Sequence, residues 1–437
     1  VPRPDLGTWQ TEDGRRWVFT LQPGLTWHDG LPVTSDDVLF TVRLVQDEQY
    51  GSPWRPYWVN RTTHKVDDRT VVFDLQRVDM FFPCDAAVPL LPAHEPSGRI
   101  GAGPFRLVEW IPGRELRLAA HRPAPTPAPQ DGVPEPGRGP LLDSYVFRIV
   151  PDEGQALRDL DAGKIDLLEV SSNAGSSADG LVRLLRSGRL AVKQFEDAGY
   201  YFLGLNVRPG SPYAGERVRK ALRLAVDPGR LIREAHLSET VVHGPALPTD
   251  RYVISSPVLF PAEAQQLLAA TGWQERQMQI LYRNDDPPRE RSIQALKRQL
   301  AEVGVTVNLV ALPQEELLRR VGLGREEPGA FDAVLMGWSI GPDPDFHSLF
   351  HSAGALNFTG YANDELDALI EEARLEPDPV KRENLVGRAA ALIATDGPYI
   401  FLYADRRTIL YDANLRGFHP GPFGQRYNVT EWHFTRK

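Results

Sequence analysis

Cysteine is nearly absent from this chain of 437 residues, because Cys84 is the only one. An internal disulfide and a multi-cysteine zinc or iron–sulfur site are therefore excluded. Long apolar runs are missing too: stretches such as Val334–Met336 and Tyr399–Tyr403 are far shorter than the roughly 18–20 residues that cross a bilayer. The printed sequence thus predicts no membrane-spanning segment.

A surplus of basic charge is missing as well. The chain carries 49 Lys and Arg against 58 Asp and Glu, a formal net charge of -9, and it has no long basic run. This balance argues against nucleic acid as a partner, because clustered cations bind a phosphate backbone. A phosphate-binding glycine loop is also absent, since Gly101 and Gly103 lack the third glycine at Arg106.

What is present is the composition of a soluble globular protein, with 42% hydrophobic and 24% charged residues. The length predicts two or three packed units. Within residues 1–100, apolar and polar residues alternate at Arg16–Leu21 and Val71–Leu75, which predicts two strands. A helix is predicted to start between them, at Thr34 or Ser35. These patterns predict a small α+β unit at the N-terminus.

The rest of the chain predicts α/β alternation. Strand patterns at Gln277–Tyr282 and Thr306–Val310 flank a helix at Arg289–Val303, the size of a crossover between parallel strands. Residues 122–140 hold seven prolines and three glycines and predict an extended surface loop. Further strands are predicted at Tyr200–Val207, Phe331–Trp338, Ile400–Tyr403 and Thr408–Tyr411.

Seven segments, in fixed order, resemble the extracellular solute-binding proteins of peptide and nickel ABC importers, known as solute-binding family 5. The segments are WVFTLQPGLTWHDGLPVTSDDVLFTV at 17–42, GAGPFRLVEWIPG at 101–113, LRDLDAGKIDLLEV at 157–170, YYFLGLNV at 200–207, ERVRKALRLAVD at 216–227, LLAATGW at 267–273 and GWSIGPDPDFHSLF at 337–350. Each is weak alone, but together they span nearly the whole chain.

The resemblance implies an α/β, two-lobed, periplasmic-binding-protein-like (type II) fold, with ligand between the lobes and an extra small α+β domain on lobe one. On this mapping residues 1–100 form the extra domain and residues 101–247 form lobe one. Residues 248–404 form lobe two, and residues 405–437 return to lobe one. The chain is then expected to cross between the lobes near 245–250 and 403–407, which would act as a hinge.

The resemblance also implies a function without catalysis and without a cofactor. The protein would capture a small solute, peptide-like, sugar or chelate, and deliver it to an ABC transporter permease. It is expected to be an extracellular, cell-surface or periplasmic monomer. The sequence begins at Val1 in a polar, proline-bearing stretch, so a secretion signal or lipid anchor is expected outside this chain. Family members usually carry several dozen residues before the segment at 17–42, including a strand of lobe one, so either the chain is a fragment or that strand is dispensable. A sensory binding module without a permease is left open as an alternative.

A catalytic alternative rests on Gly337-Trp338-Ser339-Ile340-Gly341, which fits the Gly-x-Ser-x-Gly nucleophile elbow of serine hydrolases and follows a predicted strand. That motif needs a helix directly after the serine. Pro342 and Pro344 fall within the first turn and a half, and an interior proline costs about 3 kcal/mol. A strand that ends in a tight turn at the mouth of a cleft fits Ser339 better.

His347 and His351 raise the question of a metal site, because residues four apart share one helix face. No Glu follows His347 in a His-Glu-x-x-His arrangement, and Phe346 and Phe350 indicate a helix that packs on the core. We therefore expect a surface or capping role for the two histidines and no metal site.

Aromatic and amide side chains at predicted strand ends and in loops are candidate ligand contacts. The resemblance favours Tyr201 and Trp338, because family ligands contact the matching strand ends, and Asn206 matches the family pattern. The predicted ligand-binding residues are Trp58, Tyr201, Asn206, Trp338, Ser339, Asn357, Tyr361 and Tyr403.

The resemblance also indicates what the solute is not. Peptide-binding members that resemble this chain hold the α-amino group of the ligand with an aspartate a few residues after the tryptophan that matches Trp338. Here Ser339, Ile340, Gly341 and Pro342 occupy that stretch. A buried ammonium without a charged partner is costly, so a short zwitterionic peptide held in the usual way is disfavoured. A neutral or weakly charged solute is expected.

Overall fold

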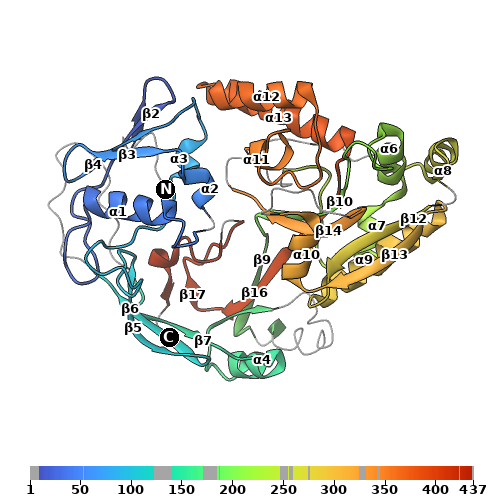
Figure 1. The fold of residues 1–437 in the computed structure, drawn as a ribbon. Helices are drawn as coiled ribbons and strands as arrows, with labels where there is room; N and C mark the ends of the chain where they lie inside the picture. The colour runs from blue at the N-terminus through green and yellow to red at the C-terminus, as the bar shows by residue number, and fades with distance from the viewer. Residues whose placement is uncertain are drawn as a thin grey trace.

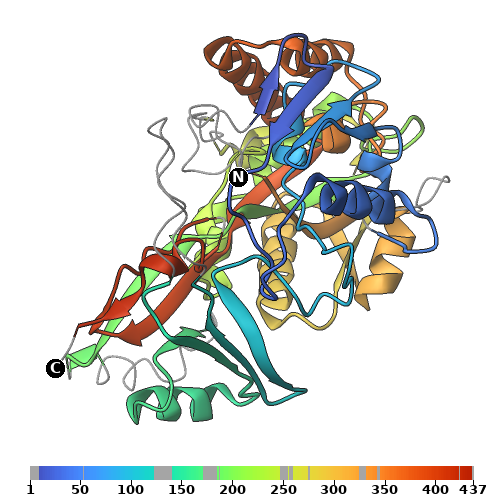
Figure 2. The same ribbon diagram turned by 90° about the vertical axis from the view of Figure 1, so that its left-hand side faces the viewer.

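The computed structural model describes residues 9–52, 54–122, 140–170, 185–186, 188–246, 254, 259–273, 276–323, 331–341, 345–422 and 424–435. The N-terminal part of the chain faces a large sheet with its helices, and further strands lie below both in the view of Figure 1. In the perpendicular view the last strands run along this lower part toward the C-terminus (Figure 2). The proline-rich stretch predicted as a loop, residues 123–139, lies outside the described residues.

The first strands and helices form a small α+β unit, here called the N-terminal unit (residues 9–100). Its antiparallel strands have the order β1-β2-β4-β3. The elements are β1 (Trp9–Thr11), β2 (Arg16–Thr20), α1 (Ser35–Gln46), α2 (Arg55–Trp58), β3 (Thr62–Lys65), β4 (Thr70–Asp74) and α3 (Phe82–Asp85). The predicted helix start is confirmed, and the Asp37 carboxylate accepts the Thr34 amide at 2.8 Å, which stabilises the first turn.

A mixed sheet of six strands forms the second lobe, with the order β11-β15-β10-β14-β12-β13. Its strands are β10 (Gly199–Leu205), β11 (Thr240–Val241), β12 (Gln277–Arg283), β13 (Thr306–Leu312), β14 (Ala333–Ser339) and β15 (Tyr399–Ala404). β12 and β13 run parallel with α9 (Pro287–Glu302) between them, so the predicted crossover is confirmed. β10 pairs antiparallel with both β14 and β15.

Helices cover this sheet and bury its apolar side chains in one continuous core. They are α6 (Glu216–Ala225), α7 (Pro228–Glu234), α8 (Pro261–Ala270), α9, α10 (Gln314–Val321), α11 (His347–Phe350), α12 (Asp364–Leu375) and α13 (Pro379–Asp396). Figure 1 shows α12 and α13 side by side, next to the N-terminal unit. Among the described residues, no helix combines the length and apolar character needed to cross a membrane.

The first lobe contains two sheets of three strands, ordered β5-β6-β7 and β8-β16-β9, and a short β17–β18 pair. Its elements are β5 (Phe105–Ile111), β6 (Glu115–Ala120), β7 (Ser144–Arg148), α4 (Glu153–Asp161), β8 (Leu167–Val170), β9 (Leu190–Glu196), β16 (Arg406–Asp412), β17 (Leu415–Arg416), a 3-10 turn at Val429–Glu431 and β18 (His433–Phe434). The two closing strands predicted near residues 400 and 408 are present as β15 and β16.

Within the described residues, the chain crosses between the two lobes at two neighbouring points. β9 leads into β10 through residues 197–198, and β15 leads into β16 through Asp405. The Asp197 amide donates to the Asp405 carbonyl at 2.8 Å, so the crossings lie side by side. The second of them falls within the predicted segment 403–407.

The first crossing lies elsewhere than predicted. The sequence assigns residues 101–247 to the first lobe, yet β10 lies between β14 and β15 in the second lobe, and β11 pairs with β15. The expected crossing at 245–250 is therefore wrong, and residues 199–241 pack with the second lobe. The apolar sequence of β10 predicts that the strand is buried, but it does not predict which sheet the strand joins.

Candidate functional site

A pocket of about 300 Å³ lies between the N-terminal unit and the second lobe, and is here called the facing pocket. Tyr57 of α2 and Asp85 of α3 line one side, while Trp338 and Ser339 at the end of β14 line the other. Its size is at the lower end of pockets that hold small organic ligands. A molecule in this pocket would contact both units at once.

A larger pocket of about 460 Å³ belongs to the first lobe alone. Tyr145 and Phe147 of β7 and Leu167 and Leu168 of β8 are among its lining residues. A ligand there would contact neither the N-terminal unit nor the second lobe, so its binding could not join the two lobes. The facing pocket is therefore the better candidate.

Tyr200 and Trp338 form an aromatic wall of the facing pocket. They are direct partners across β10 and β14, so both side chains lie on one face of the sheet. The indole Nε1 of Trp338 donates to the Tyr399 hydroxyl at 3.2 Å, so its polar edge is satisfied. The Tyr200 hydroxyl is buried without a hydrogen-bond partner among the described residues, and burial raises the pKa of this phenol well above its usual value. Such a group can be satisfied by a ligand.

The charged residues of the facing pocket are paired with one another. Arg61 lies 2.8 Å from Asp85, and Arg374 lies 3.2 Å from Asp345. Both arginines also approach Asp79, at 3.8 and 3.1 Å. Burial raises the pKa of the Asp79 carboxyl to about 6, although Arg374 acts in the opposite direction. Each pocket-lining carboxylate therefore has a cationic partner, and two guanidinium groups serve three carboxylates.

The C-terminal end of α12 joins the N-terminal unit to the second lobe beside this pocket. The Met80 amide donates to the Arg374 carbonyl at 2.9 Å, and the Arg374 guanidinium donates to Asp79 at 3.1 Å. The guanidinium of Arg382 on α13 lies 5.6 Å from the ring centroid of Phe81. These contacts hold the two walls of the facing pocket together.

The opposite face of the same two strands carries a cluster of packed side chains beside a small pocket of about 130 Å³. Tyr201 stacks on Tyr403 with ring centroids 5.4 Å apart, and the Arg289 guanidinium lies 3.3 Å from the Tyr201 centroid. Arg289 donates to both carboxylate oxygens of Asp405 at 2.9 Å, and the Tyr403 hydroxyl hydrogen-bonds with Ser292 at 2.8 Å. Tyr201 and Tyr403, which the sequence predicts as ligand contacts, lie in this packed cluster and outside the facing pocket.

Three further predicted contacts serve local structure. The Asn206 side chain donates to the Phe331 carbonyl at 2.9 Å. The Asn357 side chain donates to the Tyr361 carbonyl at 2.7 Å, and the Tyr361 hydroxyl donates to Asp396 at 2.7 Å. These side chains organise turns at strand and helix ends, and none of the three residues lines the facing pocket.

Trp58 is only 2% exposed and packs in the core of the N-terminal unit against Phe73 and Phe82. The guanidinium of Arg61 lies 5.3 Å from its ring centroid. The Trp58 ring is therefore buried and does not line the facing pocket. Of the eight predicted ligand contacts, the structure brings together only Trp338 and Ser339 in the facing pocket.

The family described as Bacterial extracellular solute-binding proteins, family 5 Middle, matches residues 2–357. The chain belongs to this family. It is 26% identical to the oligopeptide-binding protein AppA of Bacillus subtilis over 97% of its own length and 81% of that protein. It is 25% identical to heme-binding protein A of Haemophilus influenzae over 95% of its own length and 81% of that protein.

This family 5 protein also has the same fold as a substrate-binding protein of known crystal structure. The ABC transporter substrate-binding protein CtaP of Listeria monocytogenes aligns with a TM-score of 0.80 at 24% identity, over 98% of this chain and 90% of that one. The mixed α/β fold that the resemblance implied is thus confirmed. The family consists of non-catalytic substrate-binding proteins of ABC importers, so this family 5 protein is a solute-binding protein and no enzyme.

Ser339 accordingly forms no nucleophile elbow. It is the last residue of β14 and pairs with Gly199, and the next amide, that of Ile340, donates to the Ala198 carbonyl at 3.0 Å. The strand pairing thus continues past the serine, where an elbow requires a helix to begin at once. The next described helix, α11, starts only at His347.

Several residues of the facing pocket are missing from the predicted set: Tyr200, Arg61, Asp85 and Arg374. A signal existed for Tyr200, because side chains alternate along a strand and only one of two adjacent tyrosines can share a face with Trp338. The register of β10 against β14 decides which one, and that register is not readable from one strand alone. For Arg61 and Asp85 no pattern in the sequence indicates that the N-terminal unit turns them toward β14.

Proposed function

We propose that this chain captures a small solute in the facing pocket and delivers it to an ABC permease. The observation that supports this most directly is the position of the pocket between two units, with an aromatic wall and a buried Tyr200 hydroxyl that lacks a partner among the described residues. The protein acts as a monomer outside the cytoplasmic membrane, at the cell surface or in the periplasm.

Capture proceeds by a shift between open and closed forms of the protein. The N-terminal unit moves with the first lobe, because the His28 ring hydrogen-bonds with the Gly103 carbonyl at 2.9 Å. The paired crossings at residues 197–198 and Asp405 serve as the hinge. Opening breaks the contacts of Arg374 with the N-terminal unit, and a solute that touches Tyr57 and Trp338 together stabilises the closed form. The permease recognises that form.

The solute is neutral or weakly charged, such as a sugar, a modified peptide or a metal chelate. Gly341 lines the pocket in the stretch where peptide-binding members that resemble this chain carry an aspartate. The nearest described carboxylate in sequence, Asp345, lies 3.2 Å from Arg374 and is already neutralised. An ammonium group buried here would compete with that arginine. The relatives are named as oligopeptide-binding and heme-binding proteins, so membership of the family does not decide the solute class.

Native mass spectrometry of the purified chain tests the capture of a solute. A molecule carried through purification identifies the solute, and small-angle scattering should then show a smaller radius of gyration with that molecule than without it. An unchanged radius at saturating solute would contradict hinge closure.

Replacement of Trp338 by alanine tests the facing pocket. We expect affinity for the identified solute to fall at least about fivefold, because a stacking platform is lost. Trp110 is 62% exposed on β5 and does not line the facing pocket, so Trp110→Ala is the matched control and should leave affinity unchanged. Equal affinities for the two variants would place the solute elsewhere.

Calorimetric titration with a mixed library of di- and tripeptides tests the solute class. We expect no binding, because the facing pocket offers no uncompensated carboxylate for an α-amino group among its described residues. Micromolar binding that disappears when the peptide amino groups are acetylated would overturn the proposed class while leaving the proposed capture function intact.

A further inference from the structure

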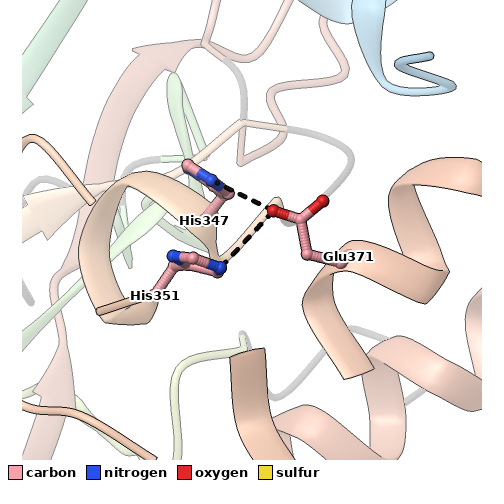
Figure 3. Close-up of side chains that lie close together, drawn as sticks. All are labelled: His347, His351 and Glu371. Carbon is pink, nitrogen blue, oxygen red and sulfur yellow. Dashed lines mark ion pairs between the residues drawn. The ribbon is translucent and has the colours of Figure 1, made fainter. Parts of the chain in front are cut away.

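Two histidines and a carboxylate converge between α11 and α12, on a side of α11 that does not line the facing pocket (Figure 3). His347 and His351 lie one helical turn apart, and their rings stack with centroids 4.4 Å apart. The Glu371 Oε1 atom lies 3.7 Å from Nε2 of His347 and 3.4 Å from Nε2 of His351. One oxygen and two ring nitrogens thus point toward a common centre.

The three ligand atoms lie within 4.8 Å of one another. In a tetrahedral zinc site, with bonds of roughly 2.0–2.2 Å to nitrogen and oxygen, ligand atoms lie roughly 3.3–3.5 Å apart. Small side-chain rotations would close this difference. Asp367 lies one turn before Glu371 on α12, and its Oδ1 is 4.0 Å from Nε2 of His351. His347 on α11 and His351, which directly follows α11, therefore face a pair of carboxylates on α12.

The site is accessible from solvent, and two arginines, Arg374 and Arg77, lie near His347. The side chain of Glu371 is 43% exposed, whereas that of His351 is 12% exposed. An ion can thus reach the site past the carboxylate. The nearby cation Arg374 is held by Asp79 and Asp345, at 3.1 and 3.2 Å, and its charge is compensated.

A hydrogen bond to the His351 ring determines which ring nitrogen must carry the proton when an ion binds. The Ala353 amide donates to Nδ1 of His351 at 3.0 Å, which assigns the proton of the neutral ring to Nε2, toward Glu371. An ion bound at Nε2 would need that proton on Nδ1 instead. The Ala353 amide would then lose its acceptor, so ion binding would rearrange the turn after α11.

We propose that His347, His351 and Glu371 bind a divalent transition metal ion such as Zn²⁺, Ni²⁺ or Co²⁺, with Asp367 as the fourth ligand. Imidazole and carboxylate together suit these ions. The ion would tie α11 to α12 and so stabilise a wall of the facing pocket, because Ser348 and Leu349 of α11 line that pocket. The spacing of the histidines raised the question of such a site, but a third ligand was not readable from the sequence, because Glu371 lies on another helix.

Calorimetric titration of the tag-free chain with ZnCl₂, NiCl₂ and CoCl₂ tests the proposal, after treatment with a chelator. We expect one equivalent of ion to bind, with a visible Co²⁺ absorption band typical of nitrogen and oxygen ligands. His351→Gln and Glu371→Gln should each weaken binding at least about tenfold. Glu371→Gln changes a half-exposed side chain, so this variant should fold even if His351→Gln does not.

Two control variants separate this site from other sources of ion binding. His433 is exposed on β18, and His433→Gln should bind the ion as the unaltered chain does. Trp338→Ala should also leave ion affinity unchanged, which distinguishes a resident ion from one carried as solute in the facing pocket. Unaltered affinity in both His351→Gln and Glu371→Gln, or no bound ion in the unaltered chain, would overturn the proposal.

Discussion

The two faces of the β10–β14 strand pair carry similar side chains in different surroundings. On one face Tyr200 and Trp338 line the facing pocket, and the Tyr200 hydroxyl has no partner among the described residues. On the other face Tyr201 lies against Arg289, and the Tyr403 hydroxyl is hydrogen-bonded to Ser292. An aromatic ring at a strand end is therefore available to a solute only where neighbouring side chains leave its polar atoms and its face free.

The largest expected effect is on the packed face. Arg289→Met removes the partner of Asp405 and should lower the free energy of unfolding by about 3 kcal/mol, since a charge pair with little exposure is broken on one side. Urea unfolding measures the loss. Lys297→Met, at an exposed position of the same helix, should change stability by less than about 0.5 kcal/mol. A loss below about 1 kcal/mol for Arg289→Met would show that the packed face does not depend on this arginine.

The charged cluster beside the facing pocket, to which Asp79 belongs, should respond to pH. The pKa of Asp79 is raised to about 6, above its unfolded value, so the folded protein binds more protons than the unfolded chain between pH 4 and 6. Stability from this group should therefore rise as pH falls through 6. Relative to Asp79→Asn, the unaltered chain should gain about 1–1.5 kcal/mol between pH 7 and pH 5. Denaturant unfolding at the two pH values measures this gain. A stability difference between the two proteins that is the same at both pH values would contradict the raised pKa of the Asp79 carboxyl.

Removal of one hydroxyl from each face gives a sharper comparison. Tyr403→Phe deletes a hydroxyl that hydrogen-bonds with Ser292 and should lower the free energy of unfolding by about 1 kcal/mol. Tyr200→Phe deletes a hydroxyl without a partner among the described residues and should leave stability unchanged or slightly raised. Thermal unfolding of both variants measures the contrast. Equal losses would mean that both hydroxyls are bonded in the folded protein.

The smallest effect is expected at the rim of the facing pocket. Ser339 is exposed at the end of β14. Ser339→Ala should change the free energy of unfolding by less than about 0.5 kcal/mol and leave solute affinity nearly unchanged. Calorimetry with the identified solute measures the second quantity. A marked loss of affinity would make this hydroxyl a direct solute contact and move the site toward the strand end.

Local patterns in the sequence were sufficient for many elements. The capping residues at Thr34 and Asp37 start α1, and the spacing of β12, α9 and β13 produces a parallel pair. Both depend on interactions between residues close in sequence or on a short connection of one hand. The crossing at Asp405 falls within the segment 403–407 that the resemblance implied, between the buried strand β15 and the strand β16.

The candidate site was much less predictable. The resemblance favours Tyr201, whereas Tyr200 stands opposite Trp338 in the structure, and the sequence of β10 alone does not show this register. Asn206, Asn357 and Tyr361 have the side chains of ligand contacts, but their hydrogen bonds are taken by nearby backbone and carboxylate groups. Whether a polar atom has a hydrogen-bond partner depends on the residues that folding brings next to it.

By itself, the sequence determined the family, the absence of disulfides, the mixed α/β character of the fold and the aromatic strand end at Trp338. Only the tertiary structure decided which aromatic residues line the facing pocket, and only it brought Arg61 and Asp85 of the N-terminal unit to that strand end. The tertiary structure also brought Glu371 to the two histidines. The physical reason is that periodicity and capping act over a few residues, whereas strand register and the docking of separate units depend on packing between distant segments.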